Sequence, residues 1–234
     1  NIIGTINILN HMMGCGINNI IFSSSAAVYG IPKYVPVDED HPMSPINFYG
    51  FTKLEIENIL FWYSKLRGIN FASLRYFNAA GYDIHGRIRG LEKNPANLLP
   101  IIMETAMGIK KSMNVFGNDY NTYDGTGIRD YIHVTDLATA HIFSLKYIQN
   151  KNENLILNLA TGKGYSVLDV IKAAEKITGN KIAIKMTNRR EGDPEELVAV
   201  SKRAREKINW CSKHSDMETI LQSMWGIYSK QNIL

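Results

Sequence analysis

Cysteine is scarce in this 234-residue sequence, which contains two, Cys15 and Cys211, far apart in the chain. Two isolated cysteines offer neither a disulfide framework nor the paired spacing of a zinc site. We therefore expect a reducing, cytoplasmic environment and no bound metal. No apolar run approaches the roughly 20 residues that cross a bilayer, so we also expect a soluble chain without membrane contact.

A glycine-rich turn between a strand and a helix is missing as well. Such a turn places the pyrophosphate of a dinucleotide at a helix N-terminus. Gly81, Gly86 and Gly90 follow an expected strand, but at the wrong spacing and with no helix after them. Because the sequence also opens without Met or a secretory signal, we interpret it as cut in mid-fold, with any dinucleotide phosphate site upstream of Asn1.

The charge of the chain is mild and evenly spread. Lys and Arg number 26 against 22 Asp and Glu, which gives a formal net charge of +4. Because the basic residues are not gathered in one stripe, we expect no nucleic acid as a partner. With 45% hydrophobic residues, the composition is that of an ordinary globular chain.

Apolar residues in the first third of the chain alternate between helical spacing and short unbroken runs. The helical spacing predicts helices over 4–13 and 49–66. The runs Asn19–Phe22 and Phe71–Phe77 contain β-branched and aromatic residues, which is typical of strands buried on both faces of a parallel sheet. Strand, helix and strand in this order predict a right-handed crossover in an open α/β sheet.

The rest of the chain is predicted to form shorter, mixed elements. We expect helices at 97–109, 136–148, 166–178 and 216–228, and strands at 155–159 and 181–186. Ser166 and Gly179 are suited to cap the third of these helices. The pattern predicts the second half of a doubly wound, nucleotide-binding parallel sheet together with a smaller mixed α/β lobe.

Tyr49 and Lys53 form the sharpest local feature. Four residues apart on an expected helix, they lie on one face, one turn from each other. A nearby ammonium favours the phenolate form of a tyrosine, so such a pair can act as a general acid and base on a hydroxyl or carbonyl. On spacing alone, two solvated residues at a helix start are the commoner explanation.

A run of three serines, Ser23 to Ser25, follows the first expected strand. Open α/β sheets bind their ligands at this edge, beyond the carboxyl ends of the strands. We expect the hydroxyl of Ser25 to converge there with Tyr49 and Lys53. The alternative is a turn in which the serines bond their own backbone.

These residues resemble the active-site half of an extended short-chain dehydrogenase/reductase. Further segments narrow the resemblance to the UDP-glucose 4-epimerase family and extend it along essentially the whole chain. The segments that carry it are Ser25–Gly30, Tyr49–Lys53, Leu74–Asn78, Asn97–Pro100, Phe116–Tyr120, Asp124–Val134 and Arg189–Asp193. The first third of such a protein, with its glycine-rich NAD turn, has no counterpart here.

The resemblance implies a fold and a reaction. Residues 1–80 would be the remainder of an NAD-binding Rossmann domain, and 81–234 mainly a UDP-sugar-binding lobe, with about 130–160 returning to the Rossmann sheet. The implied enzyme is an isomerase of galactose metabolism that interconverts UDP-glucose and UDP-galactose with NAD through a 4-keto intermediate. It would form a homodimer through the helices predicted at 4–13 and 49–66. Without the NAD turn, residues 1–234 alone would be poorly stable and bind no NAD.

Roles for individual residues follow from the same resemblance. Tyr49 would take the proton of the sugar 4-hydroxyl, Lys53 would assist it and hold the nicotinamide ribose, and Ser25 would bond the reacting oxygen. Tyr76 and Ser24 would complete the cofactor site. The residues expected to contact the UDP-sugar are Ser25, Ala26, Ala27, Asn78, Asn97, Leu98, Asn114, Val115, Phe116, Arg129, Arg190, Asp193 and Leu197. Among them the two arginines would hold the diphosphate, and Asp193 the ribose hydroxyls.

The sequence departs from the family pattern at two places that bear on the reaction. Ala27 stands where the family has threonine, which removes a hydroxyl. Leu197 is of intermediate size at a position that limits the sugar, so a 4-epimerase of UDP-N-acetylglucosamine or UDP-xylose remains an alternative. A 4,6-dehydratase lacks its acid–base pair here, because Ala26 and Ala27 occupy those positions. A non-catalytic, UDP-binding fragment is the third alternative.

Overall fold

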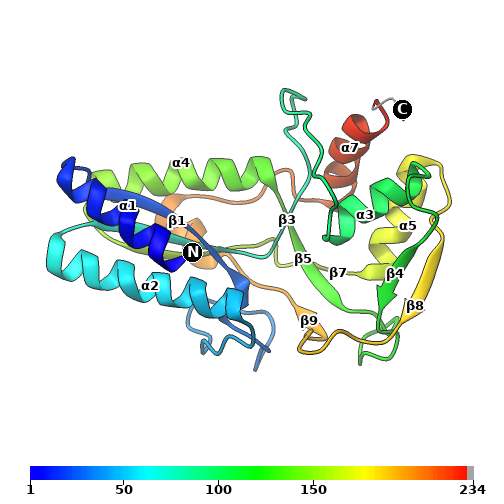
Figure 1. The fold of residues 1–234 in the computed structure, drawn as a ribbon, viewed down its shortest axis with the longest axis horizontal. Coiled ribbons are helices and arrows are strands. Elements are labelled where there is room, and N and C mark those ends of the chain that lie inside the picture. Colours follow the sequence, from blue (N-terminus) through cyan, green and yellow to red (C-terminus); the bar gives the residue numbers. More distant parts are fainter. Residues whose placement is uncertain (231–234) are drawn as a thin grey trace.

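A three-stranded parallel sheet, ordered β1–β2–β6, forms one end of the molecule in the computed structural model, which describes residues 1–230 (Figure 1). Its strands are β1 (Asn19–Ser25), β2 (Asn70–Tyr76) and β6 (Leu155–Leu159). The register pairs Ser24 with Arg75 and Ser25 with Tyr76. The carboxyl ends of β1 and β2 therefore meet side by side at one edge.

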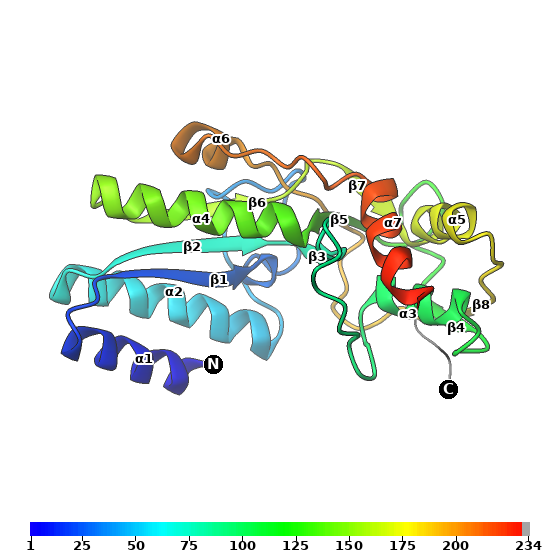
Figure 2. The ribbon, with the colours of Figure 1, turned by 90° about the horizontal axis from the view of Figure 1, so that it is seen from above.

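Helices cover both faces of this sheet. Figure 2 shows α1 (Ile2–Gly14) and α2 (Phe48–Arg67) on one side of β1 and β2, with α4 (Val134–Lys151) and α6 (Lys202–Ile208) on the other. Apolar side chains from α1, α2 and the strands fill the first layer, among them Leu9, Ile56 and Phe71. A sheet buried in this way explains the unbroken apolar runs of its strands, and the doubly wound parallel α/β fold class is confirmed.

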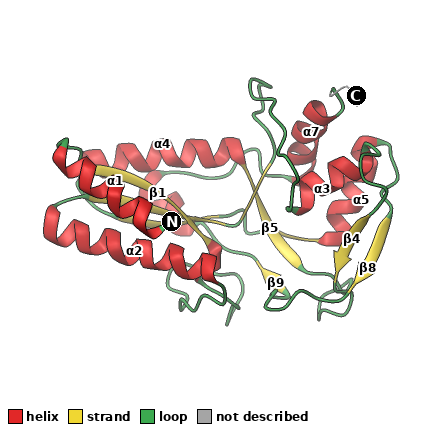
Figure 3. Ribbon diagram, in the orientation of Figure 1, coloured by secondary structure: helices red, strands yellow, loops and turns green. Residues whose placement is uncertain are grey.

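Short strands and three helices form the other end of the molecule (Figure 3). One set of strands comprises β3 (Asn78–Ala80), β5 (Ile128–His133), β7 (Gly164–Ser166) and β9 (Glu196–Leu197), and a second comprises β4 (Met113–Phe116) and β8 (Ile184–Thr187). The helices are α3 (Leu98–Ala106), α5 (Val167–Thr178) and α7 (Met217–Tyr228). They enclose a core of their own, which includes Ile102, Val170 and Ile220. The expected domain limits at residue 80 and at 130–160 stay a prediction.

A proline-rich loop connects the three-stranded sheet to the strand set that contains β9. It runs from the short 3₁₀ helix η1 (Ala26–Val28) to α2, and Val37 pairs with Ala199 in a parallel bridge just beyond β9. The Val37 N–H donates to the carbonyl of Val198, and the Val200 N–H donates to that of Val37. These bonds hold the middle of the loop beside the segment that carries Leu197.

Most of the expected elements are present, with differences at their ends. The helix predicted at 166–178 is confirmed, with Ser166 accepting a bond from the Asp169 N–H and Gly179 in a left-handed conformation at its end. The helix predicted at 97–109 ends at Ala106, because Gly108 has φ +77 and turns the chain. The strand predicted at 181–186 is displaced to Ile184–Thr187.

Within residues 1–230, no helix combines the length and the apolar stretch needed to cross a membrane. No group of three or more His, Cys, Asp or Glu side chains is placed to hold a metal ion within the same range.

Candidate active site

Ser25 ends β1 at the carboxyl edge of the sheet. It caps η1, and its hydroxyl oxygen accepts a bond from the Ala27 N–H at 3.2 Å. This is the local serine turn that the sequence left open as an alternative. The side chain nevertheless remains half-buried and lines a cavity, so its hydroxyl proton is available to a ligand.

The first turn of α2 lies directly against the turn that follows Ser25. Asn47 caps this helix by accepting a bond from the Gly50 N–H at 2.8 Å. A Cβ atom on Gly50 would lie 2.3 Å from the Ala27 carbonyl oxygen, so only glycine permits this approach. The contact places Tyr49, which is 51% exposed, at the same corner of the fold as Ser25.

Lys53 ties α2 to the end of β1. Its ammonium donates to the Ser23 carbonyl at 2.7 Å and lies 5.4 Å from the centre of the Tyr49 ring. Burial lowers the pKa of Lys53 from its ordinary value. The expected Tyr–Lys pair therefore forms on one face of α2, with the lysine held by backbone at the strand end.

Ser24 does not offer its hydroxyl to this corner. It is 1% exposed and donates to the Glu57 carboxylate on the α2 face of the sheet at 2.5 Å. Successive side chains of a strand point to opposite faces, so Ser24 and Ser25 cannot both face the site. The cofactor contact expected of Ser24 could therefore be made only by the backbone of this residue.

Tyr76 is the register partner of Ser25 and lies on the α4 face of the sheet. The centre of its ring is 6.4 Å from the centre of the His141 ring.

A cavity of about 570 Å³ lies between α3, β3, β4 and β5. Its lining brings together nine residues that the sequence assigned to substrate contact: Asn78, Asn97, Leu98, Asn114, Val115, Phe116, Arg129, Arg190 and Asp193. They come from segments more than 100 residues apart in the chain. The cavity is in the size range of pockets that bind nucleotide-sized ligands.

Two arginines supply the positive charge of the large cavity. The Arg129 guanidinium forms an ion pair with Asp193, and another of its N–H groups donates to the Ile128 carbonyl at 2.8 Å. The Arg190 guanidinium lies over the Phe116 ring, 3.9 Å from its centre. Both guanidinium groups thus border the space that a diphosphate would occupy.

A smaller cavity of about 200 Å³ adjoins the large one. Its lining contains the other four expected substrate residues, Ser25, Ala26, Ala27 and Leu197. Phe77, Asn78 and Arg129 line both cavities, so the two spaces meet at these residues. Within residues 1–230, Tyr49, Lys53 and Tyr76 line neither space.

Four residues of the smaller cavity were not predicted to line the site. Gly30 follows η1 by two residues, Ile46 and Asn47 come from the end of the proline-rich loop, and Phe77 connects β2 to β3. Phe77 lies between two predicted site residues, Tyr76 and Asn78, and this position in the sequence could have identified it as a site residue. Ile46 has no motif around it, and only the packing of the loop brings it to the cavity.

A family model described as GDP-mannose 4,6 dehydratase matches residues 1–224. The chain is also 43% identical over 229 residues to a UDP-glucose 4-epimerase from Streptococcus mutans, an alignment covering 98% of this chain and 69% of that protein.

Two solved structures are similar in fold and sequence. A UDP-glucose 4-epimerase from Brucella ovis in complex with NAD superposes with a TM-score of 0.91 at 40% identity, covering 94% of this chain and 68% of that one. A UDP-glucose 4-epimerase from Bifidobacterium longum in complex with NAD⁺ and UDP has a TM-score of 0.87 at 37% identity, covering 97% and 68%. This chain therefore spans about two thirds of the length of these relatives.

Proposed function

We propose that this chain, which belongs to the UDP-glucose 4-epimerase family, interconverts UDP-glucose and UDP-galactose by reversible oxidation at sugar C4, with NAD as its cofactor. The observation that carries the proposal is the pair of adjoining cavities. The larger one is bordered by two guanidinium groups, and the smaller one contains Ser25 and joins it at Asn78. A UDP-sugar matches this arrangement, because its large, negatively charged nucleoside diphosphate would fit the larger cavity and its single sugar ring the smaller one.

The nucleotide would be held in the larger cavity. Arg129 and Arg190 would donate charge-assisted bonds to the diphosphate. Asp193, now paired with Arg129, would turn to the ribose hydroxyls as the diphosphate replaces it on the guanidinium. Asn114 and Phe116 on β4, and Asn97 and Leu98 at the start of α3, would border the base and ribose.

The chemistry would take place at the corner of Ser25, Tyr49 and Lys53. Tyr49 would accept the proton of the 4-hydroxyl while C4 loses a hydride, which leaves a 4-keto sugar. The Lys53 ammonium, 5.4 Å from the ring centre, would favour the phenolate that accepts this proton. Ser25 would donate a bond to the reacting oxygen. Return of the hydride to the other face of C4, with the proton returned by Tyr49, completes the inversion.

The residues at the carboxyl edge of the sheet fit the nicotinamide end of the cofactor. Within the described chain, the Lys53 ammonium makes one hydrogen bond, to the Ser23 carbonyl, so two of its donors remain for ribose hydroxyls. Tyr49 and Tyr76 would border the nicotinamide from α2 and from β2. Bound NAD supplies the hydride acceptor and then the hydride donor.

Turning of the 4-keto sugar requires room in one cavity and a firm anchor in the other. Ala26 and Ala27 add no bulky or charged side chain to the lining of the smaller cavity, which Leu197 also lines. The diphosphate anchor at Arg129 and Arg190 would retain the keto sugar while it turns. Ala26 and Ala27 also carry no acid or base, which disfavours a 4,6-dehydratase.

A homodimer through α1 and α2 is part of the proposal. Large apolar side chains stand exposed along these two helices: Ile3, Ile8, Phe48, Phe51, Phe61, Trp62 and Leu66. An isologous contact between two copies would bury them together. Sedimentation of the protein should give a dimer mass, and Trp62→Glu should shift it toward monomer. A monomer mass at all concentrations contradicts this part of the proposal. We also propose a cytoplasmic location, because Cys15 and Cys211 are exposed, unpaired thiols.

The test is an assay of the protein expressed from its intact gene, with whatever sequence flanks residues 1–234. Incubation with UDP-galactose and NAD should yield UDP-glucose, and Tyr49→Phe should abolish the product. A Tyr63→Phe variant, which changes a half-buried tyrosine of the same helix whose hydroxyl donates to Asn10 on α1, is the matched control. Turnover of UDP-N-acetylgalactosamine or UDP-xylose instead would change the substrate, and no turnover of any of them would overturn the proposal.

A further inference from the structure

Glu57 lies on the same face of α2 as Tyr49 and Lys53, one turn further along. Unlike them it is fully enclosed, with 4% of its side chain exposed. A carboxylate in such surroundings is costly unless it is paired and hydrogen-bonded. Its partners therefore show what it contributes to the fold.

Two register partners of the sheet hold this carboxylate. Ser24 donates to its Oε1 at 2.5 Å, and Arg75 donates to Oε1 at 3.0 Å and to Oε2 at 2.5 Å. Ser24 and Arg75 face each other on β1 and β2, and the next pair in the register is Ser25 and Tyr76. The two residues that bind the Glu57 carboxylate therefore directly precede Ser25 and Tyr76, two of the predicted site residues.

Arg75 is itself fixed from the other side. Its Nη1 donates to the Tyr29 hydroxyl at 3.0 Å, and that hydroxyl donates to Asn158 on β6 at 2.6 Å. Burial raises the pKa of Tyr29 to about 12, so it stays a neutral donor. Burial also works to lower the pKa of Arg75, but its bonds to Glu57 outweigh this and raise it.

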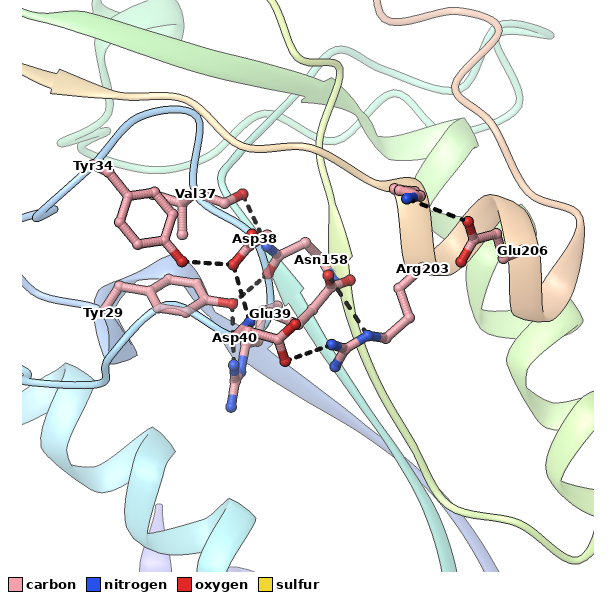
Figure 4. A network of polar contacts seen from close by, with 11 residues as sticks. Tyr29, Tyr34, Val37, Asp38, Glu39, Asp40, Asn158, Arg203 and Glu206 are labelled. Atoms are coloured by element: carbon pink, nitrogen blue, oxygen red, sulfur yellow. Dashed lines mark hydrogen bonds and ion pairs between the residues drawn. The ribbon is translucent and has the colours of Figure 1, made fainter.

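The network continues from Asn158 to the surface (Figure 4). The Asn158 N–H donates to the Glu39 carboxylate at 2.8 Å, and Arg203 on α6 forms ion pairs with Glu39 and Asp40. The guanidinium of Arg75 therefore has little freedom to follow a displaced Glu57.

We propose that Glu57, through its hydrogen bonds with Ser24 and Arg75, is a positioning residue for α2. It fixes the rotation of α2 about its axis and its distance from β1, and thereby places Tyr49 and Lys53 beside Ser25. The inference rests on the function proposed above. It concerns a side chain that lines neither of the two cavities described above.

Three contacts at successive turns of α2 support this role. Gly50 abuts the Ala27 carbonyl, Lys53 binds the Ser23 carbonyl, and Glu57 binds the Ser24 hydroxyl. The first is a close approach and the second depends on a flexible lysine. The hydrogen bond that Glu57 accepts from Ser24 is fully buried, and it is the contact that resists rotation of the helix about its axis.

Ser24→Ala removes this bond and leaves the Arg75–Glu57 pair intact. Ser73→Ala is the matched control, because Ser73 lies on the same face of β2 as Arg75, is fully buried, and makes no hydrogen bond within residues 1–230. We expect Ser24→Ala to lower kcat for UDP-galactose by on the order of 10-fold or more, with KM within about twofold.

A second measurement needs no substrate. Hydrogen exchange of the Phe51 amide, which donates to the Asn47 carbonyl in the first turn of α2, should speed up in Ser24→Ala and not in Ser73→Ala. The proposal is overturned if the two variants agree in kcat, KM and exchange. If Ser24→Ala does not fold, Glu57→Gln replaces it, and wild-type kcat and exchange in that variant overturn the proposal. Absence of epimerisation by the wild type refutes the proposed function, whereas the exchange result still decides the role of Glu57.

Discussion

Gly50 and Ala27 touch across the corner where α2 begins, and a Cβ on Gly50 would lie 2.3 Å from the Ala27 carbonyl oxygen. The contact joins the helix of Tyr49 to the turn that Ser25 caps. Backbone cannot yield as a flexible side chain does, so any side chain at position 50 must push the two segments apart.

Gly50→Ala is therefore expected to lower epimerase activity by on the order of 100-fold, because a displacement of about 1 Å at a reacting group has that effect. Overpacking should also lower the free energy of unfolding by about 1–3 kcal/mol. Gly4→Ala is the control, since Gly4 lies in α1 with open space around its Cβ, and it should stabilise the protein slightly. Steady-state kinetics and denaturant unfolding test both; normal kcat in Gly50→Ala would contradict the proposed geometry.

Arg190→Met tests the diphosphate anchor. Methionine keeps an apolar stem over the Phe116 ring and removes the guanidinium. Because a hydrogen bond to a charged group contributes about 1.5–3 kcal/mol, KM for the UDP-sugar should rise by roughly 10- to 100-fold. Arg205→Met, on the exposed side of α6, should leave KM unchanged. Equal KM values in the two variants would remove Arg190 from the binding site.

The size of Leu197 should set the breadth of sugars accepted. Leu197→Ala enlarges the smaller cavity and should raise kcat/KM for UDP-N-acetylgalactosamine by about 10-fold. Activity on UDP-galactose should change little, since no polar contact is lost. Leu197→Tyr should act in the opposite direction, and an unchanged ratio between the two substrates in both variants would show that another wall limits the sugar.

Asp130 should make stability depend on pH. Burial raises the pKa of its carboxyl to about 6, against opposing bonds from the N–H groups of Thr161 and Gly162. The folded protein thus binds this proton more tightly than the unfolded chain, where the value is about 3.9. The contribution is fully present below about pH 4 and is lost as the pH rises through 6.

Asp130→Asn cannot titrate and serves as the reference. Between pH 4 and pH 7 the free energy of unfolding of the wild type should fall by about 3 kcal/mol relative to this variant, as two units of pKa require. Denaturant unfolding at several pH values measures the difference. Parallel curves for the two proteins would show that the carboxyl is not perturbed.

The sequence predicted best what depends on long periodic patterns. Four helices were predictable because each buries one regular apolar face: α1, α2, α5 and α7. The βαβ order was predictable as well. The strands β3, β7 and β9 were not predicted, because two or three residues are too few to show alternation. The helix α6 also escaped prediction, since it has only two buried residues, Ala204 and Ile208.

For the site, motifs identified residue types but not their orientation. Thirteen residues expected to contact the substrate line the two cavities. Ser24 was expected beside the cofactor, yet the alternation of strand side chains turns its hydroxyl to the opposite face, which became evident only when β1 proved to extend to Ser25. The ion pair between Arg129 and Asp193 joins positions 64 residues apart, and no local pattern predicts such a contact.

The bridge between Val37 and the segment after β9 has a consequence for how the sequence can change. Surface loops ordinarily tolerate insertions and deletions. Here Val37 pairs with Ala199 in the middle of the loop, and the loop ends in Ile46 and Asn47, which line the smaller cavity together with Leu197. A residue gained or lost between Pro42 and Pro45 would shift Ile46 and Asn47 relative to the segment that carries Leu197. Length variation among related chains should therefore fall outside this stretch, and amino-acid substitution should be the way in which it diverges.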